Sequence, residues 1–168
     1  MTVWPFLKWP DARLRTAAEE VLEINDEVRS IWEDMIDTMD AMPGVGLAAP
    51  QIGVMLQLAV VDASDKRDRR IRLANPTVID ASALPNAHEE ASPNLPGVWA
   101  KVKRPRGVSV RFMDETGTYV RRDFVGLEAT SVQHQIDHLQ GRMYFDRLSK
   151  VKRDMLLRRA KKMSVQDK

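Results

Sequence analysis

The sequence predicts an α+β domain in which antiparallel β-sheets pack around a central helix carrying His134 and His138, with an amphipathic helix near the N-terminus and another helix at the C-terminus. Helical periodicity occurs near both ends of the chain and around the two histidines, whereas the middle of the chain reads as short strands separated by turns. A length of 168 residues with 43% hydrophobic content suits one core. We therefore expect residues 1–168 to form a single domain.

The first helix is expected to begin after Asn25, a residue type that caps helices, and to end near Pro43-Gly44. Acidic residues occupy its first turn, where they complement the helix dipole. Its apolar positions recur every three or four residues and predict one buried face: Val28, Ile31, Trp32, Met35, Ile36 and Met39.

Residues 56–62 and 71–74 read as strands, and Asn75-Pro76 predicts a bend after the second. Residues 82–96 are expected to be irregular, because three prolines lack the N–H that a β-ladder needs, and order is expected to resume at 98–102. Alternation over 108–112, a turn at 115–117 and a further strand at 119–124 predict an antiparallel hairpin.

A second helix is expected over 127–140, with Gly141 as its stop, and a third over about 149–162. The third helix would pack through one apolar face: Leu148, Val151, Met155 and Met163.

Charge is unevenly distributed along the chain. Residues 147–168 hold nine Lys or Arg against two Asp, a local charge of +7, which leaves 2 − 7 = −5 on residues 1–146. A solvated helix face and contact with an acidic partner such as RNA both explain such a stretch. No apolar run approaches a membrane span, so we expect a cytoplasmic protein that does not contact membranes. Cysteine is absent, so a metal would need histidine, carboxylate or hydroxyl ligands.

His134 and His138 are four residues apart, which places both on one face of a helix, where they can bind one metal ion. In the zinc-hydrolase pattern His-Glu-x-x-His the glutamate is a general base, but Gln135 stands there, and an amide cannot take that role. Two structural histidines in a polar part of the core are the alternative.

Three segments, in order and spacing, resemble the motifs of peptide deformylases, which are Gly-x-Gly-Leu-Ala-Ala-x-Gln, Glu-Gly-Cys-Leu-Ser and Gln-His-Glu-x-Asp-His-Leu. The resemblance covers nearly the whole chain and implies the fold of that family, a metal-dependent hydrolase that removes the N-formyl group from the methionine of nascent peptides. The matching segments are 45–51, 90–97 and 133–139.

In that family a divalent metal, iron, zinc or nickel, is held by two histidines and a cysteine. The resemblance places the histidines at His134 and His138 and the cysteine at Ser92, whose neutral hydroxyl is a much weaker ligand than a thiolate. Metal binding is therefore expected to be weak or absent.

The resemblance also assigns three groups that act on the substrate. The general-base glutamate falls on Gln135. The formyl oxygen would be held by the side chain of Gln51 and by a backbone N–H at the position of Pro93, which has none. These losses imply a deformylase-like protein with lost or strongly impaired activity.

The parts that shape the family's pocket are better kept. Gly46 and Leu47 would pair through their backbone with a bound N-terminal peptide. Glu90 and Arg104 match a structural ion pair, for which an ordinary surface contact is the alternative. The family's C-terminal helix suggests contact with the ribosome or ribosomal RNA.

Two other functions stay open. The first is a metal-dependent hydrolase, a deformylase or related amidase, that uses the two histidines with a non-standard third ligand or base from the loop holding His88, Glu89 and Glu90. The second is a metal-free binding protein in which the two histidines only fill polar core positions.

Overall fold

The computed structural model describes residues 2–166, which form two antiparallel sheets and three α-helices. The larger sheet has five strands in the order β1-β2-β3-β6-β7, and β4 and β5 form a separate two-stranded sheet. The α-helices are α1 (Asp26–Ala41), α2 (Gly126–Leu139) and α3 (Lys150–Gln166). The strands are β1 (Gly46–Ala48), β2 (Leu58–Val61), β3 (Ile71–Ala81), β4 (Pro85–Ser92), β5 (Leu95–Pro105), β6 (Gly107–Met113) and β7 (Tyr119–Val125).

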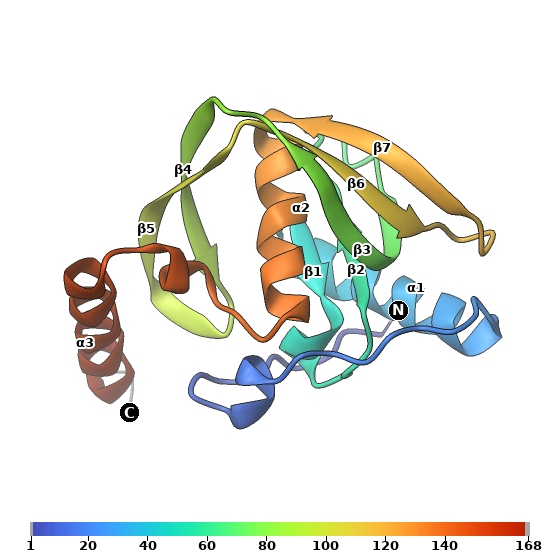
Figure 1. The fold of residues 1–168 in the computed structure, drawn as a ribbon. Helices are drawn as coiled ribbons and strands as arrows, with labels where there is room; N and C mark the ends of the chain where they lie inside the picture. The colour runs from blue at the N-terminus through green and yellow to red at the C-terminus, as the bar shows by residue number, and fades with distance from the viewer. Residues whose placement is uncertain (1, 167–168) are drawn as a thin grey trace.

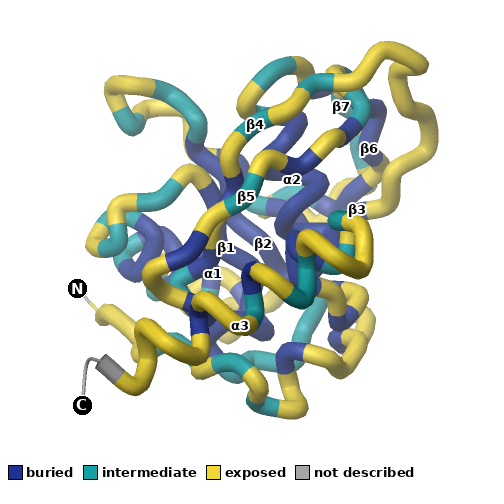
Figure 2. The backbone as a smooth tube through the Cα atoms, turned by 90° about the vertical axis from the view of Figure 1, so that its left-hand side faces the viewer, coloured by how far each residue is buried: buried dark blue, intermediate teal, exposed yellow. Residues whose placement is uncertain are grey.

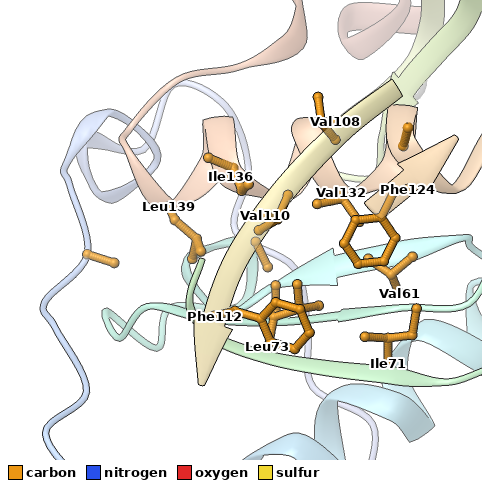
Figure 3. Packing of buried hydrophobic residues seen from close by; sticks show 14 residues of the cluster. Val61, Ile71, Leu73, Val108, Val110, Phe112, Phe124, Val132, Ile136 and Leu139 are labelled. Atoms are coloured by element: carbon orange, nitrogen blue, oxygen red, sulfur yellow. The ribbon is translucent and has the colours of Figure 1, made fainter. Parts of the chain in front are cut away.

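Helix α2 stands between the two sheets, with β4 and β5 on one side and the larger sheet on the other (Figure 1). All residues from Ala129 to Leu139 are buried, so both histidines lie inside the protein (Figure 2). One core cluster joins α2 to β6 through Val132, Ile136 and Val110 (Figure 3). The predicted α+β arrangement around a central helix is therefore confirmed.

Helix α1 forms as its periodicity predicts. The Asn25 side chain accepts a hydrogen bond of 2.9 Å from the backbone N–H of Val28. Five of the six expected apolar positions are buried, and Ile31 is partly buried against the same cluster. The predicted β6–β7 hairpin is also confirmed, with a register that runs from Gly107↔Val125 to Met113↔Tyr119.

The bend predicted at Asn75-Pro76 is a bulge inside a longer strand. Strand β3 continues to Ala81, and its register with β6 shifts between Ala74 and Thr77. Asn75 adopts the left-handed region, φ +51, which asparagine tolerates better than most residues. Its side chain binds both the N–H and the carbonyl of Val21, at 2.8 and 2.7 Å. The bulge therefore ties the N-terminal segment to the sheet.

The prediction of an irregular segment at 82–96 is wrong, because most of it belongs to the β4–β5 hairpin. Pro93 lies in the turn between the strands and Pro85 is the first residue of β4, where neither needs a ladder N–H. Each strand of a two-stranded sheet also has one edge without a partner, where a proline such as Pro96 is tolerated.

The expected packing face of the last helix is also wrong. Val151 and Met155 are 69% and 54% exposed, whereas Leu156 and Ala160 are buried against the β4–β5 side of the protein. Among the described residues, no helix combines the length and apolar character needed to cross a membrane.

Candidate active site

The two histidines of α2 direct one ring nitrogen each to the same point. The Nε2 atoms of His134 and His138 are 3.2 Å apart, and the ring centroids are separated by 4.9 Å. Two ring nitrogens bound to one tetrahedral zinc at about 2.0–2.1 Å would lie roughly 3.3–3.4 Å apart. The pair therefore has the spacing of two ligands of one metal ion.

Glu90, at the end of β4, sets the orientation of His134. Its Oε1 accepts a hydrogen bond from His134 Nδ1 at 2.8 Å, which leaves the Nε2 lone pair of His134 free. Burial alone would raise the pKa of the Glu90 carboxyl, but the hydrogen bonds from His134 and Arg104 and their charges outweigh it and hold that pKa below its ordinary value. The carboxylate stays ionised behind the histidine.

Arg104 joins Glu90 to helix α2. Its Nε and Nη2 donate to Glu90 at 2.7 and 2.8 Å, and its Nη1 donates to Asp137 at 2.9 Å. Asp137 also accepts two hydrogen bonds from Arg147, at 2.7 and 2.8 Å. The predicted Glu90–Arg104 ion pair is thus confirmed. Arg104 is only 1% exposed, which rules out the alternative of a surface contact.

His138 has a less complete environment. Burial, and then the charges of His134 and Arg104, lower its pKa well below the ordinary value, so the ring is neutral at physiological pH. Its Nδ1 is buried and has no hydrogen-bond partner within residues 2–166. A metal on Nε2 would require the single ring proton on Nδ1, where nothing accepts it. His134 fits a metal ligand well, and His138 fits one at the cost of an unpaired N–H.

Ser92, the third position of the expected ligand set, is engaged elsewhere. Its hydroxyl donates to Asn94 Oδ1 at 3.0 Å and accepts from the backbone N–H of Asn94 at 3.3 Å and from Gln51 Nε2 at 3.4 Å. Within the described part of the chain, no three His, Asp or Glu side chains are arranged to hold a metal. The residues present therefore fit a metal as a histidine pair and do not complete a site.

Gln51, the expected side-chain donor to the formyl oxygen, is held within the same network. Its Oε1 accepts from the backbone N–H of Ala48 at 2.9 Å, and its Nε2 donates to Asn94 Oδ1 at 2.8 Å and to Ser92. Asn94, which stands where the second family motif has its serine, was not identified from the sequence. It is 1% exposed and also donates to the carbonyls of Leu7 and Gln51, at 2.7 and 3.0 Å.

Gln135 packs directly against β1. A Cβ atom at Gly46 would collide with Gln135 Nε2 and Ser131 Oγ, so a larger residue there requires these side chains to move. Gln135 is 4% exposed, and its Oε1 is buried without a hydrogen-bond partner among the described residues. The position where the sequence comparison expects a general base thus holds an amide with an unpartnered carbonyl oxygen.

A pocket of about 430 Å³ opens in front of these residues. Its walls combine segments of α2, β1 and β4 and include four positions singled out from the sequence: Gly46, Gln51, Ser92 and Pro93. His134 and Gln135 line it, whereas Leu47 is fully buried and not part of its wall. Among the described strands, β1 has β2 as its one ladder partner and β4 has β5. Each strand therefore has an edge without a ladder partner, and both strands contribute residues to the pocket wall.

The alternative ligands of the neighbouring strand are not brought to the histidine pair as a metal site. His88 Nδ1 contacts Thr130 Oγ1 at 2.8 Å, and Glu90 binds the far side of His134, away from its Nε2. Glu89 lines the pocket on the exposed rim. Among the described residues, no group of three metal-ligating side chains forms here.

Comparison with known proteins agrees with the overall fold. The family described as polypeptide deformylase matches residues 3–154. A peptide deformylase from Brucella suis biovar 1 (strain 1330) is 36% identical over 168 residues, covering 99% of this chain and 96% of that protein. The crystal structure of a peptide deformylase from Legionella pneumophila has a TM-score of 0.91 and 35% identity, with 99% and 98% of the two chains covered. The peptide deformylase of Ehrlichia chaffeensis in complex with actinonin has a TM-score of 0.90 and 31% identity, with 97% and 98% covered.

Proposed function

The chain belongs to the peptide deformylase family, and we propose that it keeps the fold and peptide groove of this family while its deformylase reaction is abolished or severely reduced. The observation that carries the proposal is the unpartnered carboxamide of Gln135 beside the histidine pair, where the family has its general base. General acid–base assistance contributes roughly 10²- to 10⁴-fold to such reactions.

Two further features support the loss of activity. Pro93 lines the pocket but has no N–H to stabilise a developing oxyanion, and one such donor is worth about 10²- to 10³-fold. The Ser92 hydroxyl is occupied by Asn94 and Gln51, so the histidine pair lacks its third ligand. Base, oxyanion donor and ligand are therefore missing in one pocket.

The groove itself is supported by its two free strand edges. An extended peptide between β1 and β4 could pair with the backbone of Gly46 and of Ala91, in the manner of an added β-strand. The actinonin complex of the Ehrlichia relative makes actinonin a suitable probe of whether this pocket still accepts ligands of the family.

A second candidate is a metal-dependent hydrolase with altered chemistry. It is favoured by the spacing of the His134 and His138 Nε2 atoms and by Glu90 behind His134, which together preserve half of a metal site. Stoichiometric metal after gentle anaerobic purification, lost on His134→Ala, is the result this candidate requires.

The decisive experiment measures formate release from a formyl-methionyl peptide, with metal content determined on the same samples. The triple change Ser92→Cys, Pro93→Leu and Gln135→Glu should show activity, and the native protein should be at least about 10⁴-fold slower, from base and oxyanion donor combined. Adding His134→Ala to the triple change is the matched control and should abolish the gain. Rapid turnover by the native protein would refute the proposal.

We propose in addition that α3 contacts the ribosome or ribosomal RNA. Its cationic side chains are mostly exposed, and its buried face is limited to a few apolar positions such as Leu156 and Ala160. Such a helix offers a phosphate-binding surface without disturbing the core.

A further inference from the structure

A second cavity, of about 570 Å³, lies beside the C-terminal end of α2, where the chain runs past β5 on its way to α3 (Figure 1). It shares no lining residue with the pocket between β1 and β4. Of its seven lining residues, four are cationic and two are anionic. The cationic residues are Arg15, Lys103, Arg142 and Arg147, and the anionic ones are Asp137 and Asp146.

Two of the four cations are held in place by the wall itself. Arg15 donates to both carboxylate oxygens of Asp146, and its guanidinium lies over the ring of Trp9, 4.7 Å from the ring centroid. Arg147 donates to both oxygens of Asp137, at 2.7 and 2.8 Å. A guanidinium has five N–H groups, and each of these two uses only two of them on its carboxylate. Both therefore keep donors that no described residue accepts.

The other two cations leave the cavity with an excess of positive charge. Lys103 and Arg142 are exposed, and neither forms an ion pair with a described residue. The two carboxylates are already engaged, because Asp146 binds Arg15 and Asp137 is shared between Arg147 and Arg104. Four cationic and two anionic side chains give 4 − 2 = +2 in the wall.

We propose that this cavity is a binding site for a phosphate group. A phosphate monoester carries about −1.5 to −2 charges at pH 7 and accepts hydrogen bonds through three oxygens, which matches both the excess charge and the spare donors. Arginine is suited to this role because its planar fork fits two phosphate oxygens at once. The same excess charge disfavours a metal ion, and a single carboxylate would balance only half of it. The inference does not rest on the proposed function, because no residue of the peptide groove lines the cavity.

Two sources supply such a group, a small phosphate ester and the backbone of RNA. The volume of the cavity is in the range of small-molecule sites, roughly 300–1,000 Å³. An RNA strand would also contact cations outside the cavity, so its affinity would fall steeply with salt, by a slope of about −0.7 for each phosphate contacted. A small ester has few charges to neutralise and would show a shallower dependence on salt.

The test is titration calorimetry of the full-length protein with inorganic phosphate, uridine 5′-monophosphate and hexauridylate, each at an ionic strength matched with chloride. The double change Lys103→Gln and Arg142→Gln removes the excess charge. It should weaken binding of all three ligands at least about tenfold, because a hydrogen bond to a charged group contributes that much or more.

The matched control removes the same charge elsewhere. Lys66 and Arg106 are exposed, lie outside the cavity and form no ion pair with a described residue. The double change Lys66→Gln and Arg106→Gln should alter binding by less than about twofold, because salt screens distant surface charges. Thermal unfolding verifies that both variants fold.

The relative affinities decide the source of the phosphate. Equal binding of uridine 5′-monophosphate and hexauridylate supports a site for small esters. A hexauridylate affinity at least about tenfold higher, with a steep salt dependence, supports a site for RNA. Phosphate that binds no better than chloride overturns the proposal, and so does binding that the two double variants weaken equally.

Discussion

Arg104 is the position at which the structure gives the sharpest stability prediction. The change Arg104→Met keeps most of the side-chain volume but removes both hydrogen bonds to Glu90 and the one to Asp137. In the variant, Asp137 keeps its hydrogen bonds from Arg147, whereas Glu90 keeps only its hydrogen bond from His134. The variant therefore leaves one buried carboxylate largely uncompensated.

Removing one partner of a buried ion pair costs about 3–5 kcal/mol. Because Asp137 keeps its bidentate partner, we expect the lower part of this range, about 3 kcal/mol, for the free energy of unfolding. In a chain of this length 1 kcal/mol corresponds to roughly 2–4 °C, so Tm should fall by about 6–12 °C.

The effect should depend on pH in a defined direction. The pKa of Glu90 in the native fold lies below its ordinary value of 4.5, so its pairing stabilises the fold above that pH and is lost as pH falls through the folded pKa. The difference between native protein and Arg104→Met should therefore be largest near neutral pH and shrink in acid.

Urea unfolding of native protein and variant at several pH values measures these quantities. Lys103→Met is the matched control, since Lys103 precedes Arg104 on β5 but is exposed, and it should change stability by less than about 0.5 kcal/mol. A loss below 1 kcal/mol for Arg104→Met at neutral pH, or a loss that grows in acid, would refute the reasoning.

Four further predictions concern the pocket, the core and the last helix. Gly46→Ala should destabilise the fold by about 1–3 kcal/mol in urea unfolding because its Cβ collides with Gln135, and Gln135→Ala in the same chain should recover part of the loss. Burial, and then the charge of Glu90, raise the pKa of Tyr144 to about 12. The stability that the neutral phenol contributes should therefore be lost as pH rises from about 10 through 12. Ultraviolet titration of the native protein, compared with Tyr144→Phe, measures this pKa. Tyr144→Phe itself should not destabilise the fold at pH 7, because the hydroxyl has no partner within the described residues. Ribosome co-sedimentation should weaken with salt and be lost when four cationic residues of α3 are replaced by glutamine, namely Lys152, Arg153, Arg158 and Arg159. Co-sedimentation that survives both changes would contradict the docking proposal.

Elements with a complete local signal could be predicted from the sequence. Helix α1 has a cap, a period and a stop, and the β6–β7 hairpin has alternation on both sides of a glycine turn. The β4–β5 hairpin was missed because its prolines read as breakers, while their tolerance depends on which strand edges are free, a property of the finished sheet. The sequence predicts only a bend at Asn75-Pro76, because a side chain that ties a distant segment into a bulge leaves no local pattern.

The same limit applies to the candidate site. Helical spacing brought His134 and His138 together, and the family motifs located Glu90 and Arg104. The role of Asn94 could not be predicted, because it depends on contacts with Leu7 and Gln51, which lie 87 and 43 residues away in the chain. A polar residue in a turn gives no indication of such partners before the fold is known.

The retained residues of the site differ in what the fold needs from them, and this difference bears on function. Gly46 lies closely against Gln135 and Ser131 of α2, and Glu90 and Arg104 form a buried network, so packing and stability account for their presence. His138 is explained less completely. Its Nε2 lies 3.2 Å from that of His134, close enough for the His138 ring to donate to it, and its buried Nδ1 is then an acceptor without a partner, which costs roughly 1–3 kcal/mol. A metal on Nε2 would move the ring proton to Nδ1 and leave that atom unpaired as well, so this cost does not indicate a ligand. The structural argument for a ligand at the histidine pair rests instead on the spacing of the two Nε2 atoms and on Glu90 behind His134.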